Sequence, residues 1–239
     1  MFADDHLIPA WGRQALDWAT RLRIMVGYRD GTFRPFDQIT RIEHCVSLYM
    51  ADFDARIQAR LPDILPCVVK ISTPVSLGSG TIISGDGIVL TNRHCVEKDG
   101  VTYKEFRVSS GPWQGEVVGT LHKVCAFADL ALIKVAAPVD RYIKLGSDIR
   151  IGDGVAVIGM PLGEEDVVQP GIVGDFKGVG NDIHTSAHIN PGNSGGLLCN
   201  RHGELVGVPT YKYLNAEAMG YCIHVDVVKK FLQYSGVNA

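Results

Sequence analysis

The sequence predicts a mostly β protein that begins with a small helical module. After residue 67 the chain consists of short runs rich in β-branched residues, separated by turn signals, and the whole chain holds 27 glycines. This pattern is typical of a β protein that folds into two barrels. The first fifty residues differ, because apolar residues recur there at the spacing of a helix.

The N-terminal module is expected to hold two helices joined by a loop. The first helix carries one apolar stripe, formed by Trp11, Ala15, Trp18 and Leu22, so we expect both tryptophans in a core. Two glycines and a proline make 26–35 a loop. Thr40, with Glu43 three residues later, forms a capping box that opens the second helix. We expect this helix to reach about Arg60, before Pro62 stops it.

The strands expected after residue 67 alternate with turns. The sequence Ser84-Gly85-Asp86-Gly87 separates two apolar runs and predicts a hairpin. Expected strands lie at 81–83, 88–90, 106–108, 115–121, 130–135, 154–159, 197–199 and 205–208. A closing helix fits 226–234, with Asp226 as its N-terminal cap and Gly236 just past its end.

The segment from Asn190 to Gly196 reads Asn-Pro-Gly-Asn-Ser-Gly-Gly and predicts a serine nucleophile in a tight turn. A serine hydroxyl is a weak nucleophile, so it needs a base to take its proton and donors to hold the developing charge. Glycines let the backbone turn sharply and bring N–H groups to one point. We expect the backbone amides of Gly192 and Ser194 to be these donors.

Two upstream segments offer a base and a carboxylate. His94 lies where an apolar run gives way to a loop, and Asp129 begins another apolar run. Alone, each is an ordinary loop or turn residue, and a serine among glycines is an ordinary turn. Their joint occurrence in the order His94, Asp129, Ser194 favours a catalytic triad.

Four segments of the chain together resemble trypsin-like serine proteases of the HtrA (DegP) type, over roughly residues 67–235. These segments are Gly78-Ser79-Gly80-Thr81-Ile82-Ile83, Leu90 to His94, Asp129 to Lys134 and Asn190 to Gly196. The resemblance implies two six-stranded antiparallel β-barrels of the chymotrypsin-like kind, at about 67–140 and about 145–235. It also implies a peptide substrate and no cofactor or metal: Ser194 attacks the scissile carbonyl, His94 takes and returns the proton, and Asp129 orients His94.

The same resemblance suggests where a substrate binds. An extended peptide would pair with an edge strand at Thr210, Tyr211 and Lys212, although Pro209 removes one N–H and limits the regularity of this pairing. HtrA-type proteases usually have a small residue six positions before the nucleophile, where this chain has His188. This histidine either binds an acidic or amide side chain of the substrate, away from the usual small aliphatic preference, or points away from the pocket.

The first module, over about residues 5–51, resembles an S-layer homology (SLH) motif. The resemblance rests on the loop 26–35 and on the helix start 39–43, which has Ile42 where the family usually has alanine. It implies binding of an anionic cell-wall glycan by Arg41, Asp30 and Gly31. The alternative is that Arg41 serves only the helix start. Such motifs normally occur in threes, and one copy buries little apolar area, so we expect a homotrimer through residues 1–60.

The chain is therefore divided into an SLH-like module (1–52), a helical arm (53–66) and a protease domain (67–239). A net charge of -3 without a basic cluster argues against nucleic acid as the main partner. No apolar run approaches the roughly 20 residues of a membrane span. The start of the chain lacks the features of a signal peptide, which favours the cytoplasm, whereas the module favours a bacterial cell surface.

The six cysteines show no metal-type spacing and are expected to be buried, reduced thiols. Cys95 follows His94 where secreted trypsins have a bridged cysteine, but the partner position, near Gly78, is not cysteine. Cys199 and Cys222 are candidates to face each other on neighbouring strands.

Three functions fit these observations. The first is an active serine endopeptidase, assembled or tethered by the SLH-like module. The second is a latent or repurposed protease scaffold that acts as a binding protein, and the third is a cell-wall attachment protein. An intact triad favours the first, because a binding protein has no need of all three residues.

Overall fold

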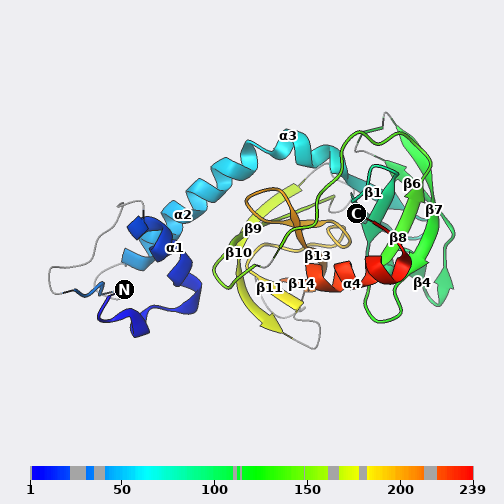
Figure 1. The fold of residues 1–239 in the computed structure, drawn as a ribbon. Coiled ribbons are helices and arrows are strands. Elements are labelled where there is room, and N and C mark those ends of the chain that lie inside the picture. Colours follow the sequence, from blue (N-terminus) through cyan, green and yellow to red (C-terminus); the bar gives the residue numbers. More distant parts are fainter. Residues whose placement is uncertain are drawn as a thin grey trace.

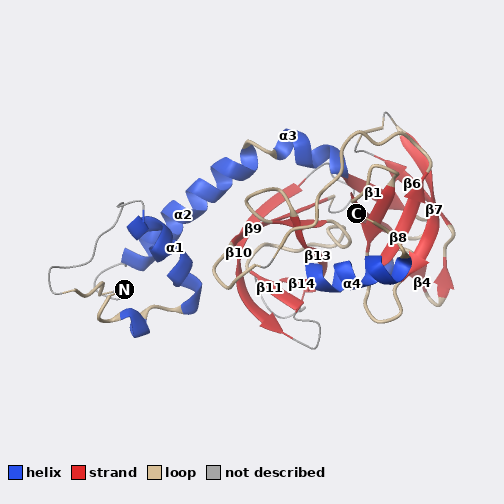
Figure 2. Cartoon of the chain, in the orientation of Figure 1, coloured by secondary structure: helices blue, strands red, loops and turns tan. Residues whose placement is uncertain are grey.

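The computed structural model describes residues 2–21, 31–34, 41–109, 112–113, 115–147, 149–160, 167–177, 182–212 and 220–238. For residues 41–44, 47, 211 and 212 it describes the backbone alone. Two closed antiparallel barrels make up most of the described chain, with helices at its N-terminal end and one helix near its C-terminus (Figures 1 and 2). The expected fold class, mostly β with two six-stranded barrels and a small helical module, is confirmed.

The first barrel closes in the order β1-β2-β3-β8-β7-β6. Its strands are β1 (Val68–Ser72), β2 (Leu77–Ile82), β3 (Ile88–Thr91), β6 (Glu105–Ser109), β7 (Glu116–Val124) and β8 (Ala131–Val135). The hairpin expected at Ser84 to Gly87 joins β2 to β3. A short ribbon of β4 (Glu97–Lys98) and β5 (Val101–Thr102) lies outside the barrel.

The second barrel closes in the order β10-β11-β14-β13-β12-β9. Its strands are β9 (Gly154–Gly159), β10 (Val167–Lys177), β11 (Asp182–Thr185), β12 (Leu197–Cys199), β13 (Leu205–Lys212) and β14 (Gly220–His224). Helix α4 (Val225–Ser235) follows, and its N-terminal cap is His224, whose Nδ1 accepts from the amide of Asp226. The expectation of Asp226 as cap was therefore wrong, whereas Gly236 ends the helix in the left-handed conformation as expected.

The N-terminal helices are η1 (Asp5–Leu7), α1 (Ala10–Arg21), α2 (Arg41–Gln58), α3 (Leu61–Ile64) and η2 (Leu65–Cys67). Trp18 is buried against Tyr49, but Trp11 is 38% exposed, so the expectation that both tryptophans are core was wrong for Trp11. Helix α2 ends at Gln58, and Pro62 lies in the first turn of α3, where its missing N–H costs nothing. Leu22, Thr40 and the Glu43 side chain lie outside what the structure describes.

Helix α2 contributes to two cores. Its first half, with Cys45 and Tyr49, packs against α1, and its second half, with Phe53 and Ile57, belongs to the same buried cluster as the barrels. The Tyr49 hydroxyl accepts a 3.1 Å hydrogen bond from the amide of Gly154 on β9. A Cβ at Gly154 would lie 2.6 Å from the Phe53 ring. The helical arm is therefore packed onto the second barrel rather than standing free of it (Figure 1).

All six cysteines lie in the described part of the chain, where they are buried and form no disulfide. Burial raises the pKa of the Cys67 thiol to about 11 and that of the Cys199 thiol to about 12, so both stay protonated and unreactive. Cys199 lies on β12 and Cys222 on β14, and β13 separates these strands, so the two do not face each other as neighbours. None of the helices in the described part of the chain is both long and apolar enough to cross a membrane.

Candidate active site

Strand pairing brings the candidate base and carboxylate together. Thr91, the last residue of β3, pairs with Ala131, the first of β8, so the chain leaves β3 where it enters β8. His94 lies in a helical turn just after β3, and Asp129 lies just before β8. Ser194 comes from the second barrel, in the turn between β11 and β12.

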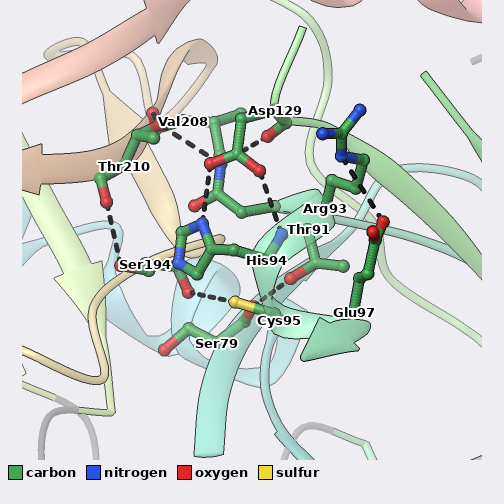
Figure 3. Close-up of polar contacts among 11 residues, drawn as sticks. Ser79, Thr91, Arg93, His94, Cys95, Glu97, Asp129, Ser194, Val208 and Thr210 are labelled. Carbon is green, nitrogen blue, oxygen red and sulfur yellow. Dashed lines mark hydrogen bonds and ion pairs between the residues drawn. The ribbon is translucent and has the colours of Figure 1, made fainter. Parts of the chain in front are cut away.

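Asp129 holds His94 with both of its carboxylate oxygens. One oxygen lies 2.6 Å from Nδ1 of the imidazole, and the other accepts a 3.0 Å hydrogen bond from the His94 backbone amide (Figure 3). The hydrogen bond that the His94 ring donates to Asp129 raises the pKa of His94 above its ordinary value. Burial alone raises the pKa of Asp129, but the hydrogen bond and charge of His94 outweigh it and hold that pKa below its ordinary value. The ring therefore presents its other nitrogen, Nε2, away from the carboxylate.

Asn92 connects this pair to the second barrel. Its side-chain amide donates to the Asp129 carbonyl oxygen at 2.7 Å and to the Thr210 hydroxyl at 3.2 Å. The Thr210 hydroxyl in turn donates to the carbonyl oxygen of Val208 on β13. Asn92 is fully buried. Sequence reasoning missed this role, although the residue stands two positions before His94.

Ser194 lies beside His94 but is not hydrogen-bonded to it in this structure. Its hydroxyl donates to the Thr210 carbonyl oxygen at 3.1 Å, and within the described residues Ser194 makes no hydrogen bond with the His94 ring (Figure 3). A rotation about χ1 of Ser194 would redirect the hydroxyl. In enzymes without substrate such catalytic hydrogen bonds are often unformed.

The turn before Ser194 has the features of an oxyanion hole. Within the described part of the chain, the amides of Gly192 and Ser194 donate to no acceptor. Gly192 has a φ of 101°, a conformation that other residues rarely adopt. Gly195 has a φ of 81°, and a Cβ there would lie 2.3 Å from the Thr91 hydroxyl. The glycines thus let the turn approach β2 and β3.

The candidate substrate strand is irregular where the sequence predicts it. The β13–β14 register shifts between Pro209 and Tyr211, which leaves Thr210 as the extra residue whose carbonyl faces Ser194. Tyr211 and Lys212 continue β13, with only their backbone described. His188 is exposed between the buried residues Ala187 and Ile189.

Two clefts flank the site. One, of about 560 Å³, lies beside His94 and Asp129 and includes Phe127, which is 57% exposed. The other, of about 500 Å³, is bounded by Gly192 and by residues 73–77, where Val75 and Leu77 are half-exposed or more. The triad residues thus have an open cleft on either side, and each cleft has room for part of an extended peptide.

Cys95 packs behind the turn. Its thiol lies 3.7 Å from the Ser194 carbonyl oxygen, and a Cβ at Gly78 would lie 2.6 Å from its sulfur. Gly78 therefore occupies the partner position expected from the sequence.

Of the candidate glycan residues, only Gly31 is described in full. It has a φ of 80°, and its carbonyl oxygen accepts from the amide of Ala3. Asp30 and the Arg41 side chain lie outside the described residues. No group of three or more histidine, cysteine, aspartate or glutamate residues is placed to hold a metal in the described ranges.

Comparisons with known proteins agree with this geometry. A family model described as trypsin-like peptidase domain matches residues 78–208, more than half of the chain, and one described as S-layer homology domain matches residues 2–43. The serine protease HTRA1 of Xenopus tropicalis is 34% identical over 179 residues, which span 70% of this chain and 37% of that protein. The serine protease HTRA4 of Mus musculus is 32% identical over 173 residues, with 67% and 34% covered.

A solved structure gives the same result. The serine endoprotease from Yersinia pestis superposes with a TM-score of 0.67 at 30% identity, covering 75% of this chain and 66% of that chain. The chain spans less than half the length of the curated relatives it matches. It belongs to the trypsin-like peptidase family, as an HtrA-type member that begins with an S-layer homology domain.

Proposed function

We propose that this protein is a serine endopeptidase that works through His94, Asp129 and Ser194. The observation that supports this most strongly is the double contact of Asp129 with His94, at 2.6 Å to the ring and 3.0 Å to the backbone amide. An aspartate that only terminates a turn needs neither contact. The backbone amides of Gly192 and of Ser194 itself, which donate to no acceptor among the described residues, complete the parts that acyl transfer requires.

In the proposed mechanism the Ser194 hydroxyl turns from the Thr210 carbonyl to Nε2 of His94. His94 takes the proton as Ser194 attacks the scissile carbonyl, and the amides of Gly192 and Ser194 bind the oxyanion. His94 then gives the proton to the leaving amine, which leaves an acyl-enzyme. Water, deprotonated by His94, hydrolyses this ester and restores the serine. Asp129 stabilises the imidazolium in both halves of the reaction.

The proposed substrate lies extended across both barrels. Residues before the cut pair with the backbone of Thr210, Tyr211 and Lys212, and residues after the cut enter the cleft beside Gly192. His188 is proposed to shift specificity away from small aliphatic residues. A peptide library cut equally well after valine or alanine by the wild type and by His188→Ala would remove that proposal.

One observation favours the alternative of a latent scaffold. The hydroxyl of Ser194 donates to Thr210 rather than to His94, so the described arrangement needs a side-chain rotation before attack. A rotation about one bond is a fast and small change. We therefore prefer the active enzyme, and the rate of peptide hydrolysis by the wild-type protein tests the alternative of a latent scaffold.

The division into a module (1–52), an arm (53–66) and a protease domain (67–239) remains part of the proposal. Arg41, Asp30 and Gly31 are proposed to bind an anionic cell-wall glycan, and residues 1–60 to form a homotrimer. Full-length protein should sediment with purified anionic wall polymer, and Arg41→Ala should weaken this binding. A monomer by light scattering at micromolar concentration would contradict the trimer.

The proteolytic function is tested with a mixture of fluorogenic peptides and an unfolded protein substrate. Wild-type protein should cleave both, whereas Ser194→Ala and His94→Ala should lose several orders of magnitude in rate. His122→Ala is the matched control, since His122 is exposed on β7, away from the triad. Cleavage by folded Ser194→Ala at the wild-type rate would exclude this mechanism.

A further inference from the structure

Ser79 holds the oxyanion turn from the opposite barrel. Ser79 lies on β2 of the first barrel and is fully buried. Its hydroxyl is 2.6 Å from the Gly192 carbonyl oxygen and 2.9 Å from the amide of Met160, just past β9. Its backbone amide donates to the Ser194 carbonyl oxygen at 2.9 Å. One residue of the first barrel thus makes three contacts with the second.

The direction of the hydroxyl bond follows from its partners. A serine hydroxyl has one hydrogen to donate and lone pairs to accept. The Met160 amide is a donor, so it occupies a lone pair of the Ser79 oxygen. The hydroxyl hydrogen is then directed at the Gly192 carbonyl, its one acceptor in the described part of the chain. No second orientation satisfies both neighbours.

These contacts fix the peptides on either side of the Ser194 amide. The Gly192–Asn193 peptide is bound at its oxygen by Ser79 and at its nitrogen by the Asn190 carbonyl, at 3.0 Å. The Ser194–Gly195 peptide is bound at its oxygen by the Ser79 amide and at its nitrogen by the Pro209 carbonyl, at 2.9 Å. The Asn193–Ser194 peptide lies between them, so its N–H keeps one direction.

Within the described residues, no side chain of the turn itself supports it in the same way. Asn193 stands between the two proposed donors and is fully buried, yet neither atom of its side-chain amide has a hydrogen-bond partner in the described ranges. The Cys95 thiol lies 3.7 Å from the Ser194 carbonyl, a long and weak contact. The Ser79 hydroxyl is therefore the side-chain group best placed to hold the turn.

We infer that Ser79 is a positioning residue for catalysis, whose hydroxyl keeps the oxyanion hole open by binding the Gly192 carbonyl. This inference rests on the proposed function, because it assigns Ser79 to the hole of that same site. Preorganised donors stabilise the transition state because they need no rearrangement at the moment of reaction. Without the hydroxyl, the Gly192–Asn193 peptide keeps only its bond to the Asn190 carbonyl, and the next peptide, which carries the Ser194 N–H, loses one of the contacts that fix its direction.

The matched pair of variants is Ser79→Ala and Thr81→Val. Thr81 lies two residues along the same strand and is also fully buried, but its hydroxyl has no partner among the described residues. Both variants remove one buried hydroxyl from β2. Ser79→Ala should lower kcat about 10- to 100-fold with little change in KM, less than the loss of a direct oxyanion donor. Thr81→Val should keep both constants.

Two inhibitor-binding measurements distinguish a role of Ser79 in catalysis from a role in folding alone. Both are made on protein whose folded fraction is confirmed by circular dichroism. A peptide boronate, which forms an oxyanion-like adduct on serine, should lose affinity for Ser79→Ala by the same factor as kcat/KM. The corresponding peptide alcohol forms no adduct and should bind as before. Ser79→Cys, which keeps a weaker donor in the same place, should give an intermediate rate. It also serves as the variant of choice if Ser79→Ala does not fold.

The outcomes distinguish the inference from the function on which it rests. If wild-type protein neither hydrolyses peptides nor binds the boronate, the proposed function fails. If wild-type protein does both and Ser79→Ala matches it in kcat and boronate affinity, the role of Ser79 is refuted. Equal losses in Ser79→Ala and Thr81→Val would also refute it, because the effect would then belong to packing of β2.

Discussion

Truncation of Phe53 tests whether the N-terminal helices and the second barrel form one body. The side chain is 1% exposed, sits in the core cluster shared with the barrels, and lies against Gly154 of β9. Replacing a buried phenylalanine by alanine costs about 3–5 kcal/mol, because the packing is lost and a cavity remains. At about 2–4 °C per kcal/mol for a chain of this size, Phe53→Ala should lower the Tm by about 10 °C.

Tryptophan fluorescence makes this test specific to the module. Of the three tryptophans, Trp11 and Trp18 lie in α1, so a Trp113→Phe background reports the module alone, while circular dichroism reports the barrels. Both signals should change at one temperature, and Phe53→Ala should move them together. The control Phe127→Ala removes a ring that is 57% exposed and should shift the Tm by little. Two separate transitions, or an unmoved barrel transition, would refute the shared core.

Three further predictions concern the site. Asp129 raises the pKa of His94, and the base must be neutral to act, so kcat/KM should rise with pH through an inflection above 6.5. Asp129→Asn should move this inflection to lower pH and lower kcat about 10⁴-fold. A pH–rate profile whose inflection does not move would contradict the pairing of Asp129 with His94. Gly78→Cys should form a disulfide with Cys95 on mild oxidation, because a Cβ at position 78 lies 3.2 Å from the Cys95 Cβ. Thiol titration before and after oxidation measures the loss of the two thiols. An unchanged thiol content would show that the two positions do not face each other. Gly195→Ala should abolish peptide hydrolysis, because its φ is 81° and a Cβ meets the Thr91 hydroxyl at 2.3 Å; wild-type activity would mean that the turn is looser than described.

The fold was predictable where residue patterns act locally. Strands 154–159 and 197–199 were expected with the bounds that the structure has, because short apolar runs there end at glycine or polar turns. The long β10 (Val167–Lys177) was not expected, since its apolar residues do not alternate cleanly and two glycines and a proline interrupt it. Trp11 was misplaced for a similar reason: helical spacing predicts a face but not what covers it.

The residues of the site also differ in how far the sequence predicted them. His94, Asp129 and Ser194 were proposed from the sequence because nucleophile, base and carboxylate each need a specific residue type. The roles of Asn92 and Ser79 arise from contacts between residues far apart in the chain, such as those from Asn92 to Thr210 and from Ser79 to Gly192. A short sequence motif does not show which distant residue its side chains contact, so the structure was needed to find these contacts.

Strand β9 connects the packing of helix α2 to the contact that Ser79 makes with the second barrel. Tyr49 and Phe53 contact Gly154 at the start of β9, and the same strand ends at the Met160 amide that Ser79 binds. One strand therefore contacts α2 at its start and is followed, at its other end, by the amide bound to Ser79.

The most direct test of the central claim is labelling with a fluorophosphonate, followed by peptide mapping. This probe reacts rapidly with a serine whose hydroxyl is activated by a base and whose adduct is stabilised by an oxyanion hole. Wild-type protein should be labelled rapidly, with the adduct on Ser194, and folded Ser194→Ala and His94→Ala should not be labelled. Folded wild-type protein that remains unlabelled, or an adduct on another residue, would contradict it.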